Sequence, residues 1–409
     1  MKLRTLAITL ATPLAIPLAL TPTLTGCGEA DEDAERLSAL AQPIVGGYVD
    51  DQTTGAVGLA MNVLDVFFFG HCSGSLIAPN VVLTAQHCVR LTDGESPSGG
   101  VICGETDFGM TAAGAAMRVT VEPVRPEADG PEFYQGTDQV RPAPGTDNLC
   151  GYDIALILLE GKGIGATVAT PLVPRLESPP VAGDSYGAIG YGNTSPDGGG
   201  SGTRMHIDDN TVTCTGLDCP AGSSVTDREW RGTAPTCSGD SGGPAIDAEG
   251  RVMGALSRGP TGCTSSIYGD VSAWRDFIIA TTLEAAELGD IDPPYWAVTG
   301  SSEPPPAAQP GEECIGVCTE GYACARSLGK RICVPTCDEA NPTCPSGASC
   351  DLHSGGCVEP PPVPATEDEG GCTMAPHPDS PSHARWLWGW VALVILVRRR
   401  RPRPRDCRR

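Results

Sequence analysis

The sequence predicts an all-β barrel or sandwich in residues 44–290, with one helix near its end and a small cysteine-rich module after it. Short apolar runs, such as residues 81–83 and 154–159, are separated by Gly, Pro, Asn and Asp, a pattern typical of strands joined by turns. The 52 glycines and 38 prolines among 409 residues argue against an all-helical protein. In residues 271–288 apolar positions recur at helical spacing, and Gly289 follows as a stop signal, which predicts the helix.

Composition and charge limit the classes of protein to which the chain can belong. At about 100–200 residues per domain, the chain has room for two or three domains. Its formal net charge of -23 excludes general nucleic-acid binding through phosphate neutralisation. The arginines gathered in residues 398–409 are a local basic exception. Nineteen cysteines favour an oxidising location outside the cytosol.

The first 27 residues have the layout of a secretory signal. Lys2 and Arg4 precede an apolar run that ends in small residues, and the prolines within that run oppose a stable membrane helix. The sequence LTGC, residues 24–27, resembles the lipobox of bacterial lipoproteins, in which the cysteine is acylated after cleavage. The resemblance implies lipidation of Cys27, and an ordinary signal peptide is the alternative.

The other end of the chain has the features of a surface anchor. Gly371 and Cys372 precede the apolar residues 386–397, and arginines occupy residues 398–401. An apolar helix of that length spans about 18 Å, less than the ~30 Å hydrocarbon core, although flanking residues can extend it. The arrangement resembles the C-terminal sorting tail of myxobacterial surface proteins, which implies that Cys372 is a processing site and that the tail anchors the chain in a membrane. A plain tail anchor is the alternative.

These features divide the chain into expected segments. They are a lipoprotein-like signal peptide (1–27), an acidic pro-segment (28–43), the β domain (44–290), a proline-rich linker (291–310), a cysteine-rich disulfide module (311–357), a second linker (358–371) and the anchor tail (372–409). Three successive prolines make the first linker semi-rigid.

Eight cysteines define the module in residues 311–357. They stand at 314, 318, 324, 333, 337, 344, 350 and 357. Zinc sites favour paired C-x-x-C spacings with histidine nearby, whereas the tightest spacing here is C-x-x-x-C and His353 is the one local histidine. Four disulfides fit better, with a connectivity that the sequence leaves open. The module resembles small cysteine-rich repeats of bacterial surface proteins and is expected to serve as a spacer or docking element.

The most specific stretch of the β domain is TCSGDSGGP, residues 236–244. Its glycines permit tight turns that can aim the backbone N–H groups of Gly239 and Ser241 at one point. Donors arranged in this way form an oxyanion hole, which stabilises a tetrahedral intermediate. Ser241 is therefore the candidate nucleophile, and a serine hydroxyl needs a base to act as one.

The candidate base and its partner are His87 and Asp153. His87 precedes Cys88, and a disulfide from Cys88 to Cys72 would hold the histidine loop beside a strand. Asp153 stands directly before an apolar run, where a loop enters a buried strand. A carboxylate there can accept the imidazole N–H and hold the tautomer that leaves the other nitrogen basic.

Together these residues resemble the chymotrypsin-like serine protease family over about residues 44–280, in the order His, Asp, Ser. The resemblance implies two antiparallel six-stranded Greek-key β-barrels, an active-site cleft between them and a C-terminal helix. It implies that Ser257 is a partner of the buried Asp153. It also implies the disulfides Cys72–Cys88 and Cys237–Cys263, together with Cys103–Cys150 and Cys214–Cys219.

A second family motif stands at the start of the β domain. The sequence IVGG, residues 44–47, resembles the new N-terminus that zymogens of this family expose on cleavage. The resemblance implies that the freed ammonium of Ile44 pairs with Asp240, because a buried carboxylate without a partner is costly. The pair would order the loop that carries Gly239 and Ser241. Pro43 precedes the cleavage point, which makes it a poor site for an activating protease of trypsin-like specificity.

The resemblance assigns four positions to the substrate pocket, which receives the residue before the scissile bond (P1). They are Pro235, Ser257, Gly259 and Ser266. Trypsin-like members carry aspartate at the position of Pro235, so a basic P1 side chain would be buried here without a counter-charge. Gly259 leaves one wall open and Ser266 narrows the other, which predicts an uncharged P1 residue, apolar or small.

Two further positions and one interval depart from the family pattern. Gln86 replaces the alanine usual before the histidine, and Arg258 replaces the usual aromatic residue beside the pocket. The interval from His87 to Asp153 is longer than usual, and residues 91–150 are interpreted as an inserted surface loop.

The leading hypothesis is a zymogen-activated serine endopeptidase that cleaves protein or peptide substrates without a cofactor or metal. It would be exported to the cell surface or beyond, with its tail anchored at the outer membrane. Two alternatives remain: a catalytically silent surface binding protein on a protease fold, and an adhesin whose cysteine-rich module is the functional part.

Overall fold

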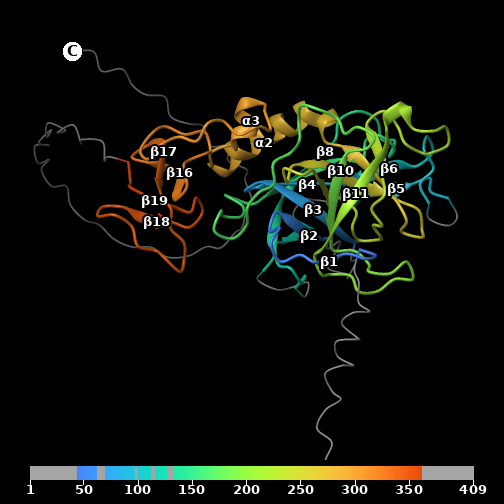
Figure 1. The fold of residues 1–409 in the computed structure, drawn as a ribbon, viewed down its shortest axis with the longest axis horizontal. Helices are drawn as coiled ribbons and strands as arrows, with labels where there is room; N and C mark the ends of the chain where they lie inside the picture. Colours follow the sequence, from blue (N-terminus) through green and yellow to red (C-terminus); the bar gives the residue numbers. More distant parts are fainter. Residues whose placement is uncertain (1–43, 62–69, 97–99, 112–115, 127–131, 362–409) are drawn as a thin grey trace, which may run out of the picture. The chain divides into compact units, whose positions relative to one another are not determined.

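The computed structural model describes residues 44–361, apart from 62–69, 97–99, 112–115 and 127–131 (Figure 1). The segments predicted as a signal peptide with Cys27, a pro-segment and an anchor tail with Cys372 lie outside the described residues. In the described ranges no helix has both the length and the apolar character that crossing a membrane requires.

The first half of the β domain closes into a six-stranded antiparallel barrel. In sheet order its strands are β2 (Ala56–Met61), β3 (Gly70–Ala78), β4 (Val81–Thr84), β9 (Ala155–Leu159), β8 (Tyr134–Pro142) and β7 (Met117–Thr120), and β7 pairs back with β2. Val57, Val82 and Ile157 fill the interior because alternate residues of a strand point to the same side. Leu156 and Leu158 of β9 point outward into a second core cluster.

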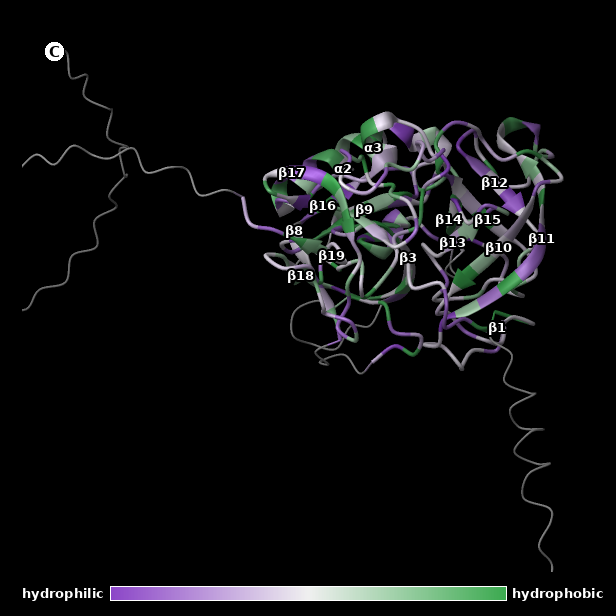
Figure 2. Cartoon of the chain, turned by 60° about the vertical axis from the view of Figure 1, so that its left-hand side comes forward, coloured by the Kyte–Doolittle hydropathy of each residue, from purple (hydrophilic) through white to green (hydrophobic). Residues whose placement is uncertain are grey.

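The second half forms another closed six-stranded barrel. Its strands, in sheet order, are β11 (Met205–Thr215), β10 (Ser185–Gly190), β13 (Pro244–Ile246), β14 (Val252–Arg258), β15 (Ser266–Asp270) and β12 (Glu229–Gly232), and β12 pairs back with β11. Trp230 and Tyr268 stack in its interior with ring centroids 4.3 Å apart. The short β1 (Tyr48–Val49) adds to β11, along which hydrophilic and hydrophobic stretches follow one another (Figure 2). The two barrels confirm the expected all-β fold.

The predicted C-terminal helix is α2 (Arg275–Gly289), and Asp290 takes the left-handed conformation after it. Ile278 of α2 packs against the outward face of β9 in the second core cluster. A further short helix, α3 (Tyr295–Thr299), lies beside α2 (Figure 1). It falls in the segment expected to begin the first linker. The reason for the difference is Trp296, whose buried ring joins the same core cluster.

Residues 91–150 are not one inserted surface loop, because they contain the barrel strands β7 and β8. They also contain most of a hairpin between β5 (Arg90–Asp93) and β6 (Asp107–Thr111). A disulfide from Cys103 to Cys150 joins this hairpin's loop to the segment before Asp153.

The cysteine-rich module consists of two small hairpins. One pairs β16 (Tyr322–Ser327) with β17 (Lys330–Pro335), and the other pairs β18 (Ser349–Asp351) with β19 (Gly356–Val358). The eight cysteines form four disulfides, which are Cys314–Cys324, Cys318–Cys333, Cys337–Cys350 and Cys344–Cys357. Because every sulfur is bonded to another, none of these cysteines is a zinc ligand. The module contacts the β domain where Ala166 N donates to His353 O at 2.8 Å.

Candidate active site

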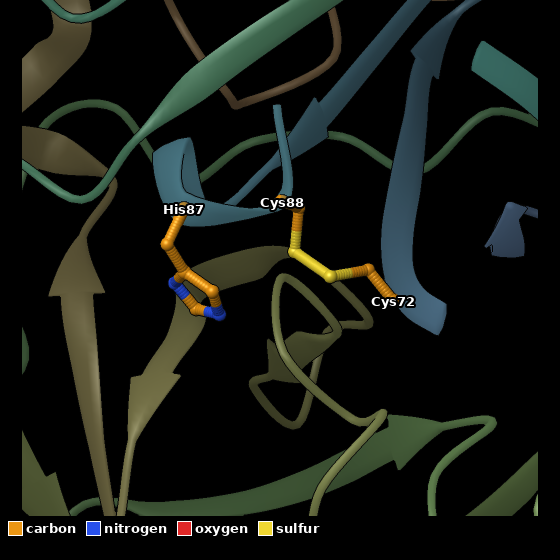
Figure 3. Close-up of side chains that lie close together, drawn as sticks. All are labelled: Cys72, His87 and Cys88. Atoms are coloured by element: carbon orange, nitrogen blue, oxygen red, sulfur yellow. A yellow bond between two sulfur atoms is a disulfide. The ribbon is translucent and has the colours of Figure 1, made fainter. Parts of the chain in front are cut away.

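His87 lies in a 3-10 turn, Gln86–Cys88, directly after β4. Its neighbour Cys88 forms a disulfide with Cys72 of β3, and Figure 3 shows the three side chains together. The strand and the disulfide therefore fix the backbone from which the imidazole projects. The two sulfurs are bonded to each other, so Cys72, His87 and Cys88 cannot bind a metal as a trio.

Asp153 lies two residues before the start of β9 and is 2% exposed. It accepts three hydrogen bonds. His87 Nδ1 lies 2.8 Å from Oδ2, the backbone N of His87 donates to Oδ1 at 2.9 Å, and Ser257 Oγ donates to Oδ2 at 2.6 Å. The carboxylate thus holds both the main chain and the ring of His87, and it leaves Nε2 as the free ring nitrogen.

The two charges of this pair stabilise one another. Burial disfavours the charged carboxylate of Asp153, but the His87 charge, its hydrogen bonds and the Ser257 hydroxyl outweigh burial and lower the pKa. Burial likewise opposes the imidazolium of His87, but attraction and hydrogen bonding from Asp153 outweigh it and raise the pKa. Asp153 therefore stays ionised while His87 exchanges a proton.

The main chain of Ser241 is fixed where the two barrels meet. Its carbonyl accepts a hydrogen bond from Ser73 N of β3 at 2.8 Å, and it lies 3.6 Å from Cys88 Sγ beside the histidine turn. The next residue, Gly242, has φ +78°, and a Cβ there would meet Thr84 Oγ1 at 2.0 Å. Only glycine therefore allows the turn to approach β4 this closely.

The backbone donors near Ser241 are available. In the described part of the chain, the N–H groups of Gly239 and Ser241 have no hydrogen-bond acceptor, although Gly239 O accepts from Ser73 Oγ at 2.9 Å. Two such donors beside a serine can receive a developing oxyanion.

Asp240 is buried at 1% exposure between two glycines of the second barrel. Its Oδ1 accepts from Gly192 N at 2.7 Å and its Oδ2 accepts from Cys237 N at 2.8 Å. A Cβ on Gly190 would come within 2.2 Å of Oδ1. No ion pair joins Asp240 to a cation among the described residues, and burial raises its pKa to about 7. Ile44 is also buried, and its nitrogen is still part of a peptide bond.

The four predicted pocket positions differ in exposure. Ser266 is buried, and its hydroxyl donates to Ala234 O at 2.6 Å beside Thr236 Oγ1. Pro235 is partly exposed and Gly259 is exposed. Ser257 is buried and donates to Asp153 Oδ2 at 2.6 Å. No charged side chain stands at these positions.

Sequence reasoning missed two contacts of the site. With its amide nitrogen turned toward the loop, Gln86 reaches Tyr152 O at 2.8 Å and Ile154 O at 3.3 Å, on both sides of Asp153. Gln86 therefore ties the histidine turn to the aspartate loop. Arg258 pairs with Glu229, and no local pattern signals a partner at that separation.

Comparisons with known proteins identify the family that the β domain resembles. The family model described as Trypsin matches residues 44–278. The chain is 30% identical over 237 residues to "Trypsin Blo t 3" of Blomia tropicalis, which covers 54% of this chain and 80% of that protein. It is 29% identical over 221 residues to "Trypsin" of Saccharopolyspora erythraea, covering 51% and 85%. It is 28% identical over 237 residues to "Bradykinin-releasing enzyme KR-E-1" of Gloydius ussuriensis, covering 53% and 88%.

Proposed function

The chain belongs to the trypsin family of serine peptidases, and on that premise we propose that it is an active endopeptidase that works through an acyl-enzyme. The observation that carries the proposal is the line of hydrogen bonds from Ser257 through Asp153 to His87, beside the fixed main chain of Ser241. A catalytically silent binding protein would not require these hydrogen bonds.

In the proposed reaction, Ser241 Oγ attacks the carbonyl carbon of the scissile bond and gives its proton to His87 Nε2. Asp153 holds Nδ1–H and stabilises the imidazolium. The oxyanion forms within reach of the N–H groups of Gly239 and Ser241. As the C–N bond breaks, His87 returns the proton to the leaving amine. Water then attacks the acyl-enzyme with His87 again as the base, which releases the acid and restores Ser241.

We propose an uncharged P1 residue, apolar or small. The support is a pocket whose four positions carry no charge, so a basic P1 side chain would be desolvated without a partner. Profiling with peptides that differ only at P1 tests this, with Phe, Leu and Ala expected ahead of Arg and Lys. A preference for Arg or Lys would reject this specificity without affecting the proposed chemistry.

We propose that cleavage before Ile44 activates the chain. The freed ammonium would supply the cation that Asp240 lacks in the uncleaved chain. Ile44→Gly is expected to lower activity because the smaller side chain loses its buried contacts, whereas Val45→Ala, at a more exposed position, is expected to be close to wild type. Unchanged activity in Ile44→Gly would contradict this route.

We also propose export, with anchoring through the C-terminal tail. Cleavage before Ile44 would separate Cys27 from the enzyme, so an N-terminal lipid would leave with the pro-segment. Fractionation of cells that produce Cys27→Ala and Cys372→Ala variants tests this. The mature enzyme is expected to lose its membrane association in the second variant only.

Active-site labelling tests the proposed function directly. The chain with a free Ile44 is treated with a fluorophosphonate, and the adduct is mapped by mass spectrometry. A single adduct on Ser241 that disappears in His87→Ala is expected. An unlabelled chain with a verified Ile44 terminus would favour the catalytically silent alternative.

A further inference from the structure

Arg258, the last residue of β14, is held by a buried carboxylate. Its Nη1 and Nη2 bind Oε1 and Oε2 of Glu229 at 2.6 and 2.9 Å, and the two side chains are 11% and 1% exposed. A guanidinium and a carboxylate joined by two parallel hydrogen bonds have a fixed relative orientation. Arg258 is therefore fixed in place and is not free to bind a substrate carboxylate.

Glu229 is fixed in turn by the segment before the candidate aspartate. It accepts from Gly151 N at 2.8 Å and from both the backbone N and the hydroxyl of Thr226 at 2.9 Å. Gly151 stands two residues before Asp153 in the chain. The ion pair thus connects the end of β14 to the loop that carries Asp153.

A further hydrogen bond of Arg258 determines the direction in which the hydroxyl of the neighbouring Ser257 donates. Nη1 donates to Ser257 Oγ at 3.0 Å, and Ser257 Oγ donates to Asp153 Oδ2 at 2.6 Å. A guanidinium only donates and an ionised carboxylate only accepts. With Arg258 on a lone pair of Oγ, the single hydroxyl proton of Ser257 is directed to Asp153.

We propose that Arg258, clamped by Glu229, is a positioning residue for the reaction: it commits the Ser257 hydroxyl to Asp153 and thereby fixes the carboxylate that orients His87. This inference rests on the proposed function. It assigns a role to a position where the family resemblance leads one to expect an aromatic side chain. The contact is made through Ser257, because Arg258 has no hydrogen bond to Asp153 or His87 in the described structure.

The charge of Arg258 also acts on His87. The charged groups that face the imidazole are Asp153 and Glu95, which favour its protonated form, and Arg258, which opposes it. Removal of the guanidinium is therefore expected to raise the pKa of His87. The acid limb of the kcat/KM profile would then move to higher pH, because a larger fraction of His87 is protonated at each pH.

The test compares Arg258→Met, the charge-retaining Arg258→Lys and the double variant Arg258→Met/Glu229→Gln in the chain that begins at Ile44. In Arg258→Met the buried carboxylate of Glu229 has lost its cation, which could unfold the protein. The double variant neutralises that carboxylate as well. We expect Arg258→Met to raise the His87 pKa by about 0.5–1 unit, and the double variant to raise it by less, because the loss of the Glu229 charge acts in the opposite direction. The shift is measured by the acid limb of kcat/KM and by NMR titration of ¹⁵N-histidine, with the His87 signal assigned from His87→Gln. Arg258→Lys is expected to stay near wild type in pKa.

A double-mutant cycle tests the route through Ser257. Arg258→Met is expected to lower kcat on the pH-independent plateau about tenfold, and less than about twofold in a Ser257→Ala background. The inference would be overturned if the His87 pKa did not shift in either variant that carries Arg258→Met. It would also be overturned if the effects of Arg258→Met and Ser257→Ala on plateau kcat simply multiplied. If the wild-type chain neither cleaves peptides nor reacts with the fluorophosphonate, the proposed function is wrong. The NMR titration would still measure the effect of Arg258 on the His87 pKa.

Discussion

Asp153 and Asp240 are both buried carboxylates near the candidate nucleophile, yet their environments shift them in opposite directions. Asp153 accepts from the ring and backbone of His87 and from Ser257, and its pKa is lowered. Among the described residues, Asp240 accepts from two backbone N–H groups only, and its pKa is raised to about 7. The two carboxylates are similarly buried, so the direction of each pKa shift depends on the groups that donate to it. Asp153 has a cationic partner in His87, whereas Asp240 has no cation within the described part of the chain.

Asp153→Asn is expected to have the largest effect on activity of the substitutions at these two carboxylates. Asp153 accepts on both oxygens, whereas an amide has one oxygen and an NH2 group that only donates. The NH2 group cannot replace the acceptor of the His87 backbone N–H, and when it faces the ring instead, Nδ1 must accept and the histidine loses its useful tautomer. We expect kcat to fall by about 10⁴-fold, measured with a peptide substrate. The matched control is Asp147→Asn, an exposed partner of Arg90, which is expected to change kcat less than about twofold.

Asp240→Asn is expected to have the next largest effect, in the chain cleaved before Ile44. The ammonium would be buried without its anion, at a cost of about 3 kcal/mol, so kcat/KM is expected to fall about 100-fold. The control is Asp209→Asn, an exposed residue of β11. Nearly wild-type kcat/KM in Asp240→Asn would mean that the ammonium has a different acceptor.

In the uncleaved chain, the raised pKa of Asp240 makes the stability of the fold depend on pH. Because the pKa of Asp240 is raised from 3.8 to about 7, the folded state binds more protons than the unfolded state between those values. The stability from this group is present below about pH 4 and is lost as pH rises through about 7. In a Ser241→Ala background, Tm is expected to fall between pH 5 and pH 8 by more than in the same chain with Asp240→Asn. After cleavage before Ile44 this excess is expected to disappear.

A third buried carboxylate, Asp270, should give the smallest effect. Burial raises its pKa, and the hydroxyl and backbone N of Ser272 counteract this by donating to Oδ1 at 2.8 and 2.9 Å. Ser272→Ala removes one donor, so the free energy of unfolding should fall by about 1 kcal/mol at pH 8. Because its pKa is raised, a larger fraction of the carboxyl is protonated at pH 4 than at pH 8, so the fall should be smaller at pH 4, and kcat should not change. Denaturant titration at both pH values measures the difference.

The sequence predicted those parts of the molecule that depend on local patterns. The turn around Ser241, the strand after Asp153 and the helix before Asp290 all follow from glycine positions or apolar periodicity. Two of the strands within residues 91–150 were missed for a physical reason. Strand β6 buries one residue of five, and β8 carries a register shift, so neither has the alternation that marks a strand.

Long-range pairings could not be predicted from spacing. Glu229 and Arg258 become neighbours only because β12 and β14 flank β15 in the closed barrel. The connectivity of the module's cysteines depends in the same way on which hairpins form. The burial of Trp296, which converts part of the expected linker into α3, needs a tertiary surface that no local window contains.

The pairing of β1 with β11 has a kinetic consequence for the proposed cleavage before Ile44. Tyr48, four residues after Ile44, is registered against His206, so the segment is attached to the barrel before any cleavage. A free end of that length reaches at most about 14 Å. A new amino terminus at Ile44 would therefore remain at an effective concentration in the millimolar range or above. Its capture would be first order and independent of protein concentration, and a soluble peptide could compete only at comparable concentration.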